Sequence, residues 1–431
     1  MLLRKADLLR ASKHGDVNSV TRLLKEKSLN PNVANNDGET PLILAARHGH
    51  VDIFRILLSN GADVDKKDSN GWSPLLWACN CGRLDVVRLL LSRDDVYVDD
   101  TSNNGATSLM WAAKSNHIDV IKALLHKGAD VFRKDYHGST AIMYACHEGH
   151  LRIVQLLLES YHKPEDLDQG NANGTTPLMW ACKSGRFEIA RSLISKGADV
   201  YKTDSDGENA LMRAVRAGHE ELVDLLLTRS TKANVDAQCM NKLVTALMLA
   251  SGYGNVHILT ALLEHGADVN LIDDDGYTAL MYASQEGHFD AMRALLTYGA
   301  DLNSQARNKL TAFDLADKGG YKEAADMLRT ITYDKNVEIG RQLMYDNVIR
   351  PSAHTVPVPR DFPMEYITFC TQNFIKARKK GEGSFGVVYL AQDPKDEAIE
   401  FVVKRSKINL LSEKDLKSLR DTFEKEIRVR F

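Results

Sequence analysis

The sequence lacks any uncharged apolar stretch of about 18 residues, the length that a membrane-spanning helix requires. Its first residues, MLLRKADLLRASKHGD, interrupt the apolar side chains with charges, so they contain no signal-peptide core. An excess of one charge is absent too, because 55 Lys and Arg stand against 58 Asp and Glu. This balance provides no general attraction to nucleic acids or to anionic membranes. We therefore expect a cytoplasmic protein with neither a membrane span nor a nucleic-acid partner.

Cysteine is scarce, with six residues in 431, which argues against a disulfide framework. Cys79, Cys146 and Cys182 follow an alanine in three matching segments, where another segment has Ala46. A position that accepts either alanine or cysteine is small and buried, so we expect packing rather than redox or metal chemistry. Most histidines fall in glycine-containing turns without the close spacing of metal ligands, and no metal site is predicted.

The first three quarters of the sequence repeat. Segments similar to DGETPLILAARHGHVDIFRILLSNGADV return along the chain. The glycines near their starts lie 33, 34, 33, 36 and 33 residues apart: Gly38, Gly71, Gly105, Gly138, Gly174 and Gly207. A period of this size indicates a stacked array.

Each repeat is predicted to form two helices. One position in each repeat carries a side chain that can accept a hydrogen bond from the free amides of a helix start. These residues are Thr40, Ser73, Thr107, Thr140, Thr176, Asn209, Thr245, Thr278 and Thr311. A glycine ends the first helix, and the second carries apolar residues four apart, such as Ile53 and Leu57. One such pair cannot cover its own apolar face, so neighbouring pairs must stack.

These motifs resemble the ankyrin repeat family over residues 37–330, with eight full repeats, a divergent N-terminal cap at 1–36 and a C-terminal cap. The resemblance implies a mostly α-helical solenoid that binds protein partners on its concave face. The family's usual His in TPLH is replaced by Ile43, Leu76 or, in the later repeats, Met. We therefore expect the turn-tying hydrogen bond of that histidine to be absent and packing to hold the fold.

Candidate contact residues on the concave face are four side chains at the tips of the hairpins: Trp72, Tyr136, His137 and Tyr277. A second set stands one residue before the first alanine of a first helix: Trp77, Trp111, Tyr144, Trp180 and Tyr282. Apolar residues at a repeated helical position are usually core, so we favour packing between helices for this set, with partner contact as the alternative. Extra residues after Glu159 and after Thr228 are interpreted as surface loops, with a binding insertion as the alternative.

Beyond Leu328 the repeat pattern ends. Residues 331–365 contain four prolines, which oppose a helix and favour an extended tether: Pro351, Pro357, Pro359 and Pro363. We expect a linker between two domains.

Residues 366–431 have a different pattern. The stretch KKGEGSFGVVYLA places G-x-G-x-x-G before apolar residues that read as a second strand, so the loop is predicted to close a hairpin. A third strand, EFVVKR, carries Lys404 between apolar residues. An amphipathic helix then begins at Ser412, with Glu426 beside its apolar stripe.

This order of elements resembles the N-terminal lobe of a protein kinase, in the tyrosine-kinase-like group that includes receptor-associated and plant receptor-like kinases. The resemblance implies a partial α+β lobe that binds ATP with magnesium through Gly381, Glu382, Gly383, Ser384, Phe385, Gly386, Val388, Lys404 and Glu426. The glycines would let backbone amides approach the phosphates, and Val388 would cover the adenine. Lys404 would hold the α- and β-phosphates and would pair with Glu426. Lys380 and Val402 depart from the residues usual in kinases.

The sequence contains no H-R-D, D-F-G or A-P-E motif, so no catalytic residue is predicted in this chain. Two hypotheses stay open. In the first, the array brings a substrate or regulator to a protein kinase whose catalytic half lies beyond Phe431; unfinished packing of the last helix favours this interpretation. In the second, the chain is a non-catalytic scaffold with a vestigial lobe.

Overall fold

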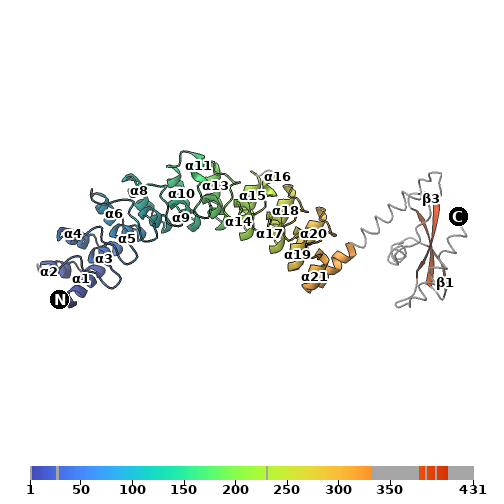
Figure 1. Ribbon diagram of the computed structural model, residues 1–431, viewed down its shortest axis with the longest axis horizontal. Helices are drawn as coiled ribbons and strands as arrows, with labels where there is room; N and C mark the ends of the chain where they lie inside the picture. Colours follow the sequence, from blue (N-terminus) through green and yellow to red (C-terminus); the bar gives the residue numbers. More distant parts are fainter. Residues whose placement is uncertain are drawn as a thin grey trace. The chain divides into compact units, whose positions relative to one another are not determined.

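The computed structural model describes residues 2–25, 29–229 and 232–331, and the strand segments 378–383, 386–393 and 396–405 (Figure 1). The chain divides into two compact parts, Met1–Leu328 and Arg329–Phe431.

The first part is a stack of helix pairs. The first helices of the pairs, called the inner helices, are α1 (Leu2–His14), α3 (Pro41–His48), α5 (Pro74–Asn80), α7 (Ser108–Lys114), α9 (Ala141–Glu148), α12 (Pro177–Lys183), α14 (Ala210–Ala217), α17 (Ala246–Tyr253), α19 (Ala279–Glu286) and α21 (Ala312–Lys318). The second, outer helices are α2 (Val17–Lys25), α4 (Val51–Ser59), α6 (Leu84–Leu91), α8 (Ile118–His126), α10 (Leu151–Leu158), α13 (Phe187–Ser195), α15 (Glu220–Leu227), α18 (Val256–Glu264), α20 (Phe289–Thr297) and the helical residues 322–331.

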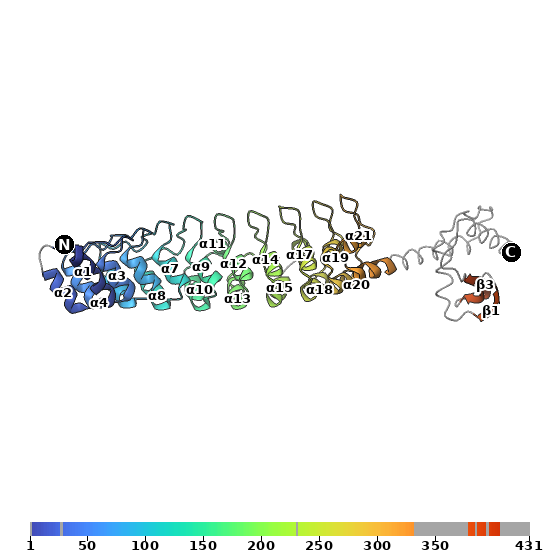
Figure 2. The ribbon, with the colours of Figure 1, turned by 90° about the horizontal axis from the view of Figure 1, so that it is seen from below.

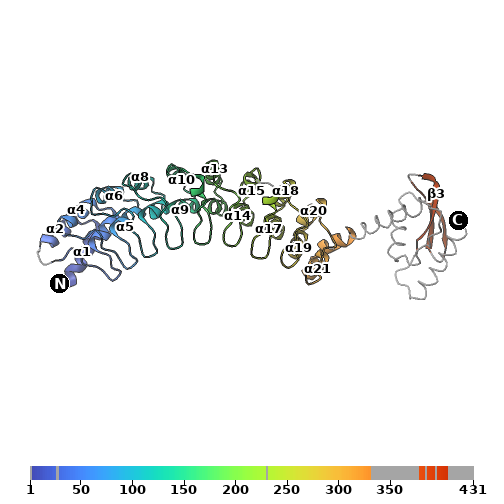
Figure 3. The ribbon, with the colours of Figure 1, turned by 45° about the horizontal axis from the view of Figure 1, so that its top comes forward.

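Within these described residues the chain forms eight repeats, from repeat 1 (α3 and α4) to repeat 8 (α19 and α20), between two terminal helix pairs. The predicted helical array with its caps is therefore confirmed. Hairpin loops precede the inner helices and project as a row from one side of the stack (Figures 2 and 3). The extra residues in repeats 4 and 6 each include one short helix, α11 (Pro164–Leu167) and α16 (Lys232–Val235).

Thr40 shows how a repeat begins. Its Oγ1 accepts a hydrogen bond from the N–H of Ile43 at 3.2 Å, and Pro41 occupies the first turn of the helix. Seven further capping residues accept the same kind of bond, whereas Thr140, alone among the nine described caps, makes no such bond. Gly49 ends α3 with a φ of 78°, a conformation that glycine adopts without strain.

In three repeats a methionine provides a weaker version of the turn-tying hydrogen bond that the family's histidine makes. The sulfur of Met110, Met179 and Met248 each accepts the backbone N–H of the capping threonine three residues earlier, at 3.4 Å. A thioether is a weak acceptor. The expected loss of a turn-tying bond is thus only partial, because in these three repeats the sulfur supplies a weaker one.

Two rows of bonds join neighbouring repeats. Along the hairpins, the N–H of Ser69 donates to the carbonyl of Asp37 at 2.8 Å, and equivalent bonds recur at each following hairpin as far as Arg307 and Asp275. At the turns between helices, Nε2 of four histidines lies 3.0 Å from a main-chain carbonyl of the preceding helix pair: His50, His117, His150 and His288. These turn histidines therefore have a structural role.

The cysteines predicted to pack are fully buried: Cys79, Cys146 and Cys182. Burial raises the pKa of the Cys182 thiol to about 12 and raises the pKa of the other two as well. A thiol with such a pKa stays protonated and unreactive near neutral pH. The packing interpretation of these cysteines is confirmed.

In the second part, the described strands β1 (Arg378–Gly383), β2 (Gly386–Asp393) and β3 (Asp396–Arg405) form an antiparallel sheet in the order β1-β2-β3. Gly383 pairs with Gly386, so the glycine loop closes a hairpin, as the sequence predicts. Lys404 in β3 pairs with Val388 in β2. The predicted linker beyond residue 331 and the predicted helix with Glu426 lie outside the described residues.

Candidate functional site

The hairpin and inner helix of a repeat meet through three positions: the residue before the cap, and the residues four and seven after it. In repeat 1, Glu39 Oε1 pairs with Arg47 Nη1 at 2.8 Å. In repeat 2, the ring centroids of Trp72 and Trp77 lie 4.6 Å apart. These three positions of all repeats form a surface that we call the inner face.

The even-numbered repeats carry an aspartate at the base of the hairpin. Its Oδ1 accepts two backbone N–H groups of the hairpin, as Asp68 Oδ1 does from Asn70 and Trp72 at 2.9 Å. Its Oδ2 accepts from the side chain four residues after the cap. The pairs are Asp68 with Trp77 Nε1 at 2.9 Å, Asp135 with the Tyr144 hydroxyl at 2.7 Å, Asp204 with Arg213, and Asp273 with the Tyr282 hydroxyl at 2.7 Å.

The odd-numbered repeats have no such aspartate. In repeats 1 and 7 the inner-helix residue is a leucine, Leu44 or Leu249, and needs no acceptor. In repeats 3 and 5 it is Trp111 or Trp180, while Ser102 or Asn171 occupies the hairpin base. The Nε1 of both tryptophans is buried, and the described residues provide it with no acceptor. The two kinds of repeat therefore hold their inner-face rings differently.

Aromatic rings and basic side chains lie beside one another along repeats 1 to 5. The Arg47 guanidinium lies 4.2 Å from the Trp77 ring centroid, and Lys114 Nζ lies 5.3 Å from that of Trp111. Such distances are typical of cation–π contacts. We call the whole set the inner-face ladder: Arg47, Trp72, Trp77, Trp111, Lys114, Tyr144, His147, Trp180 and Lys183.

Repeats 6 to 8 present a different inner face. Arg213 and Arg216 both pair with Glu208, and Arg213 also pairs with the buried Asp204, so these cations are neutralised within the repeat. Repeat 7 offers only Leu249 and Gly252 at the helix positions. The hairpin tips carry exposed acidic side chains: Asp206, Asp274 and Asp275. The ladder therefore ends before repeat 6.

The structure distributes the predicted tip residues over three repeats. Trp72 is half-buried between Trp77 and Trp111, with a centroid distance of 4.4 Å to Trp111. Tyr136 and His137 lie together at the tip of repeat 4, where 77% of Tyr136 is exposed. Tyr277 lies in repeat 8, half-buried beside Tyr282. Only Trp72 joins the ladder.

The second predicted set is half-buried rather than core. Packing between helices, which the sequence favours, is therefore an incomplete description of Trp77, Tyr144 and Tyr282. Each donates a hydrogen bond to its own hairpin, because a half-buried N–H or O–H needs an acceptor. That contact fixes the ring on the inner face.

Sequence reasoning missed the cations and the aspartates. A signal for both exists: a basic residue recurs seven positions after the cap, and the aspartate recurs nine positions before the residue that donates to it.

Burial, together with the hydrogen bonds to Asp135 and Asp273, raises the pKa of Tyr144 and Tyr282 above the usual range. Both phenols are therefore fixed as donors at neutral pH.

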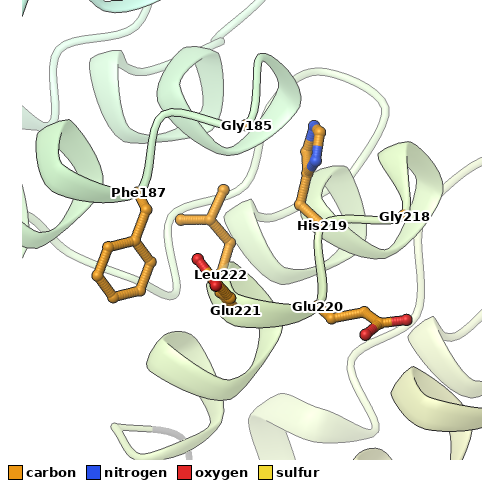
Figure 4. Close-up of a pocket in the computed structure, with 7 residues that line it drawn as sticks. All are labelled: Gly185, Phe187, Gly218, His219, Glu220, Glu221 and Leu222. Atoms are coloured by element: carbon orange, nitrogen blue, oxygen red, sulfur yellow. The ribbon is translucent and has the colours of Figure 1, made fainter.

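Figure 4 shows a hollow between repeats 5 and 6, at the turns between helices. It is lined by Gly185, Phe187, Gly218, His219, Glu220, Glu221 and Leu222.

No group of three or more His, Cys, Asp or Glu in the described part of the chain could hold a metal ion. None of the described helices is long and apolar enough to cross a membrane.

The predicted nucleotide residues lie partly within the described strands. Gly381, Glu382 and Gly383 are in β1, Gly386 and Val388 in β2, and Lys404 in β3. Ser384, Phe385 and Glu426 lie outside the described residues. The backbone therefore brings the glycine hairpin and Lys404 into one sheet.

Known proteins resemble the array. The family model described as "Ankyrin repeats (3 copies)" matches overlapping stretches from residues 8–100 to 247–339. "Ankyrin repeat and KH domain-containing protein mask-1" of Caenorhabditis elegans is 39% identical over 84 residues, which are 20% of this chain and 3% of that protein. "Ankyrin repeat and SAM domain-containing protein 6" of Mus musculus is 38% identical over 65 residues, 15% of this chain and 7% of that protein.

"Ankyrin repeat domain-containing protein 49" of Bos taurus is 42% identical over 57 residues, 13% of this chain and 24% of that protein. The chain thus spans less than a quarter of the length of each of these relatives. The family matches, in contrast, cover most of the chain, from residue 8 to residue 339. With its hairpins, paired helices and capped repeats, the chain belongs to the ankyrin repeat family.

Proposed function

We propose that the array is a protein-binding scaffold whose contact surface is the inner face. The observation that carries this proposal is the inner-face ladder. Four half-buried rings occupy the same position in successive inner helices, and Trp72 and exposed cations lie beside them. Aromatic and basic side chains are those that dominate the energetics of protein interfaces.

Site-specific cross-linking tests the scaffold proposal. A photoreactive phenylalanine analogue is placed at His147 or Lys183 on the inner face, and at the exposed outer-helix positions Arg88 or Arg152 as matched controls. Cells expressing the full chain are irradiated. We expect discrete protein adducts from the inner positions and none from the outer ones. Equal adducts from both sides would contradict the proposal.

Alanine at the predicted tip residues Trp72, Tyr136 and Tyr277 sharpens the test. Tyr136→Ala is the cleanest variant, because that side chain is largely exposed and its loss should not affect folding. We expect weaker adducts with this variant at unchanged thermal stability.

We also propose that the glycine hairpin and Lys404 form the phosphate-binding side of an ATP site, as in a protein kinase lobe. The antiparallel order β1-β2-β3 and the pairing of Lys404 with Val388 support this proposal. Backbone N–H groups of Gly381, Gly383 and Gly386 suit close approach to phosphates, and Lys404 would add a positive charge. Two roles follow for such a lobe. It belongs to a protein kinase to which the array brings substrates, or it is part of a scaffold that does not catalyse phosphoryl transfer. The experiment below distinguishes them.

Calorimetric titration with ATP and magnesium tests this second function. The sequence contains no H-R-D or D-F-G motif to supply a catalytic base or magnesium ligands, so we expect weak binding by the 431-residue chain and no phosphoryl transfer. The weak binding should disappear in Lys404→Met and persist in the control Lys407→Met. Equal loss in both variants, or none in either, would remove Lys404 from the site.

A further inference from the structure

We propose that the inner-face ladder binds an acidic segment of a partner protein in the polyproline II conformation. This inference rests on the proposed scaffold function and specifies the chemistry of the partner. Its first support is the arrangement of the rings. Trp77, Trp111, Tyr144 and Trp180 occupy one position in the successive inner helices α5, α7, α9 and α12. A bound chain that runs along the array therefore meets one ring in each of four repeats.

The spacing between the inner helices suits a bound segment in the polyproline II conformation. Packed helices lie about 8–10 Å apart. A polyproline II chain has three residues per turn and rises about 3.1 Å per residue, so one turn advances about 9 Å. A segment with proline at every third position thus presents one proline ring to each inner helix. Aromatic-lined grooves bind such segments favourably, because the conformation is preformed and little entropy is lost.

The charges of the ladder call for an acidic segment. Lys114 and Lys183 are exposed, and neither forms an ion pair with any carboxylate of the described residues. The aspartates at the hairpin bases of repeats 2 and 4 are buried and use both carboxylate oxygens within their own repeat. Carboxylates spaced along a bound segment would therefore complement the two lysines.

The same contacts argue against a cationic ligand. Lys114 already lies near two rings, and Lys183 lies 5.2 Å from the Trp180 centroid, whereas Arg47 is paired with Glu39. An added cation would have to displace or approach these side chains, and like charges repel.

The chain contains a proline-rich segment of its own, RPSAHTVPVPRDFP at residues 350–363. It carries two arginines and a single aspartate, so its charge does not complement the ladder. We therefore assign the ladder to a segment of another protein.

Fluorescence anisotropy with the full chain tests the inference. The probe is a labelled (Pro-Glu-Ala)5 peptide, compared with (Pro-Lys-Ala)5, with a peptide of the same Pro, Glu and Ala content in scrambled order, and with a peptide of residues 350–363. We expect the acidic periodic peptide to bind at least tenfold more tightly than the others, and its affinity to fall as salt rises.

Two double variants locate the binding. Lys114→Gln with Lys183→Gln should weaken binding of the acidic peptide about tenfold. Arg88→Gln with Arg152→Gln removes the same charge from exposed positions on outer helices and should leave binding unchanged. Circular dichroism verifies that both variants are folded.

Equal binding of the lysine peptide or the scrambled peptide overturns the inference, as does equal sensitivity to the two double variants. Tighter binding of the 350–363 peptide overturns it as well, because the ladder would then be filled by the chain itself. If no acidic peptide binds while photo-cross-links still form from the inner positions, the partner chemistry is wrong and the scaffold function stands. Loss of the inner cross-links would contradict the scaffold function itself.

Discussion

Repeats 2, 4 and 8 hold their inner-face ring in one way, and repeats 3 and 5 hold theirs in another. In repeat 2, Trp77 donates to Asp68, so the ring is tied to the base of its own hairpin. In repeat 5, Trp180 occupies the same position, but Asn171 replaces the aspartate and the indole N–H has no acceptor among the described residues. The residue at the hairpin base, nine positions before the tryptophan, thus decides whether the indole N–H donates a hydrogen bond or stays without an acceptor. The comparison teaches that ring orientation on this face is set by the hairpin and not by helix packing alone.

Removing the acceptor from repeat 2 should have the largest effect. In Asp68→Asn the side-chain oxygen can keep its two backbone bonds, but an NH2 group then faces the Trp77 N–H. Two donors facing each other leave a buried polar group unsatisfied, which costs about 1–3 kcal/mol. Urea unfolding of the full chain, followed by tryptophan fluorescence, measures this loss.

The matched control is Asp135→Asn in repeat 4. The Tyr144 hydroxyl can accept a hydrogen bond as well as donate one, so the new amide can donate to it. We expect a clearly smaller loss than in Asp68→Asn. Equal losses would mean that the charge of the aspartate, rather than its acceptor, stabilises the even repeats.

Converting an odd repeat to the even kind should stabilise it. Asn171 Oδ1 already accepts from the N–H groups of Asn173 and Thr175, which leaves its NH2 at the position of an aspartate Oδ2. Asn171→Asp would therefore give Trp180 Nε1 an acceptor, worth about 0.5–1.5 kcal/mol. The gain is measured by the same unfolding experiment.

Asn35→Asp in repeat 1 is the control for that gain. Leu44 has no donor to offer, and the change removes the bond from Asn35 Nδ2 to Glu39 Oε2 at 2.9 Å. We expect no stabilisation. A similar gain in both variants would show that hairpin charge, and not the indole bond, is responsible.

Alkaline pH should weaken repeats 4 and 8 through their inner-face tyrosines, whereas repeats 3 and 5 have tryptophan at the same position. Burial raises the folded-state pKa of Tyr144 and Tyr282, so the folded chain holds these protons more tightly than the unfolded chain. Their contribution is complete below the usual tyrosine pKa of about 10 and is lost as pH rises towards the folded-state pKa. Tyr144→Phe with Tyr282→Phe should flatten the fall in unfolding free energy above about pH 10; an unchanged slope would contradict the assignment.

Much of the array could be predicted from the sequence because its signals are local. Capping threonines, turn glycines and apolar residues four apart each act within one helix pair, and the period of the pattern requires stacking. Thr140 shows the limit, since the right residue at the right position makes no capping bond. The hairpin closed by Gly383 and Gly386 was predictable for the same local reason.

The inner-face ladder was less accessible to sequence reasoning because it depends on contacts between repeats. Lys114, for example, lies near the Trp111 ring of its own repeat and near the Tyr144 ring of the next repeat. Trp72 was identified as a tip residue, but its place between two rings follows only from the stacking of repeats 2 and 3. The roles predicted for Lys404 and Glu426 stay predictions.

The indole N–H spectrum of the full chain, labelled with ¹⁵N-tryptophan, tests the central claim most directly. The four tryptophans of the sequence, Trp72, Trp77, Trp111 and Trp180, all belong to the inner-face ladder, so every indole signal reports on it. On titration with (Pro-Glu-Ala)5 we expect the signals of Trp111 and Trp180 to move most, and that of Trp77 to move least because its N–H is held by Asp68. Four signals that stay unmoved at millimolar peptide would contradict the claim that this face binds an acidic polyproline II segment.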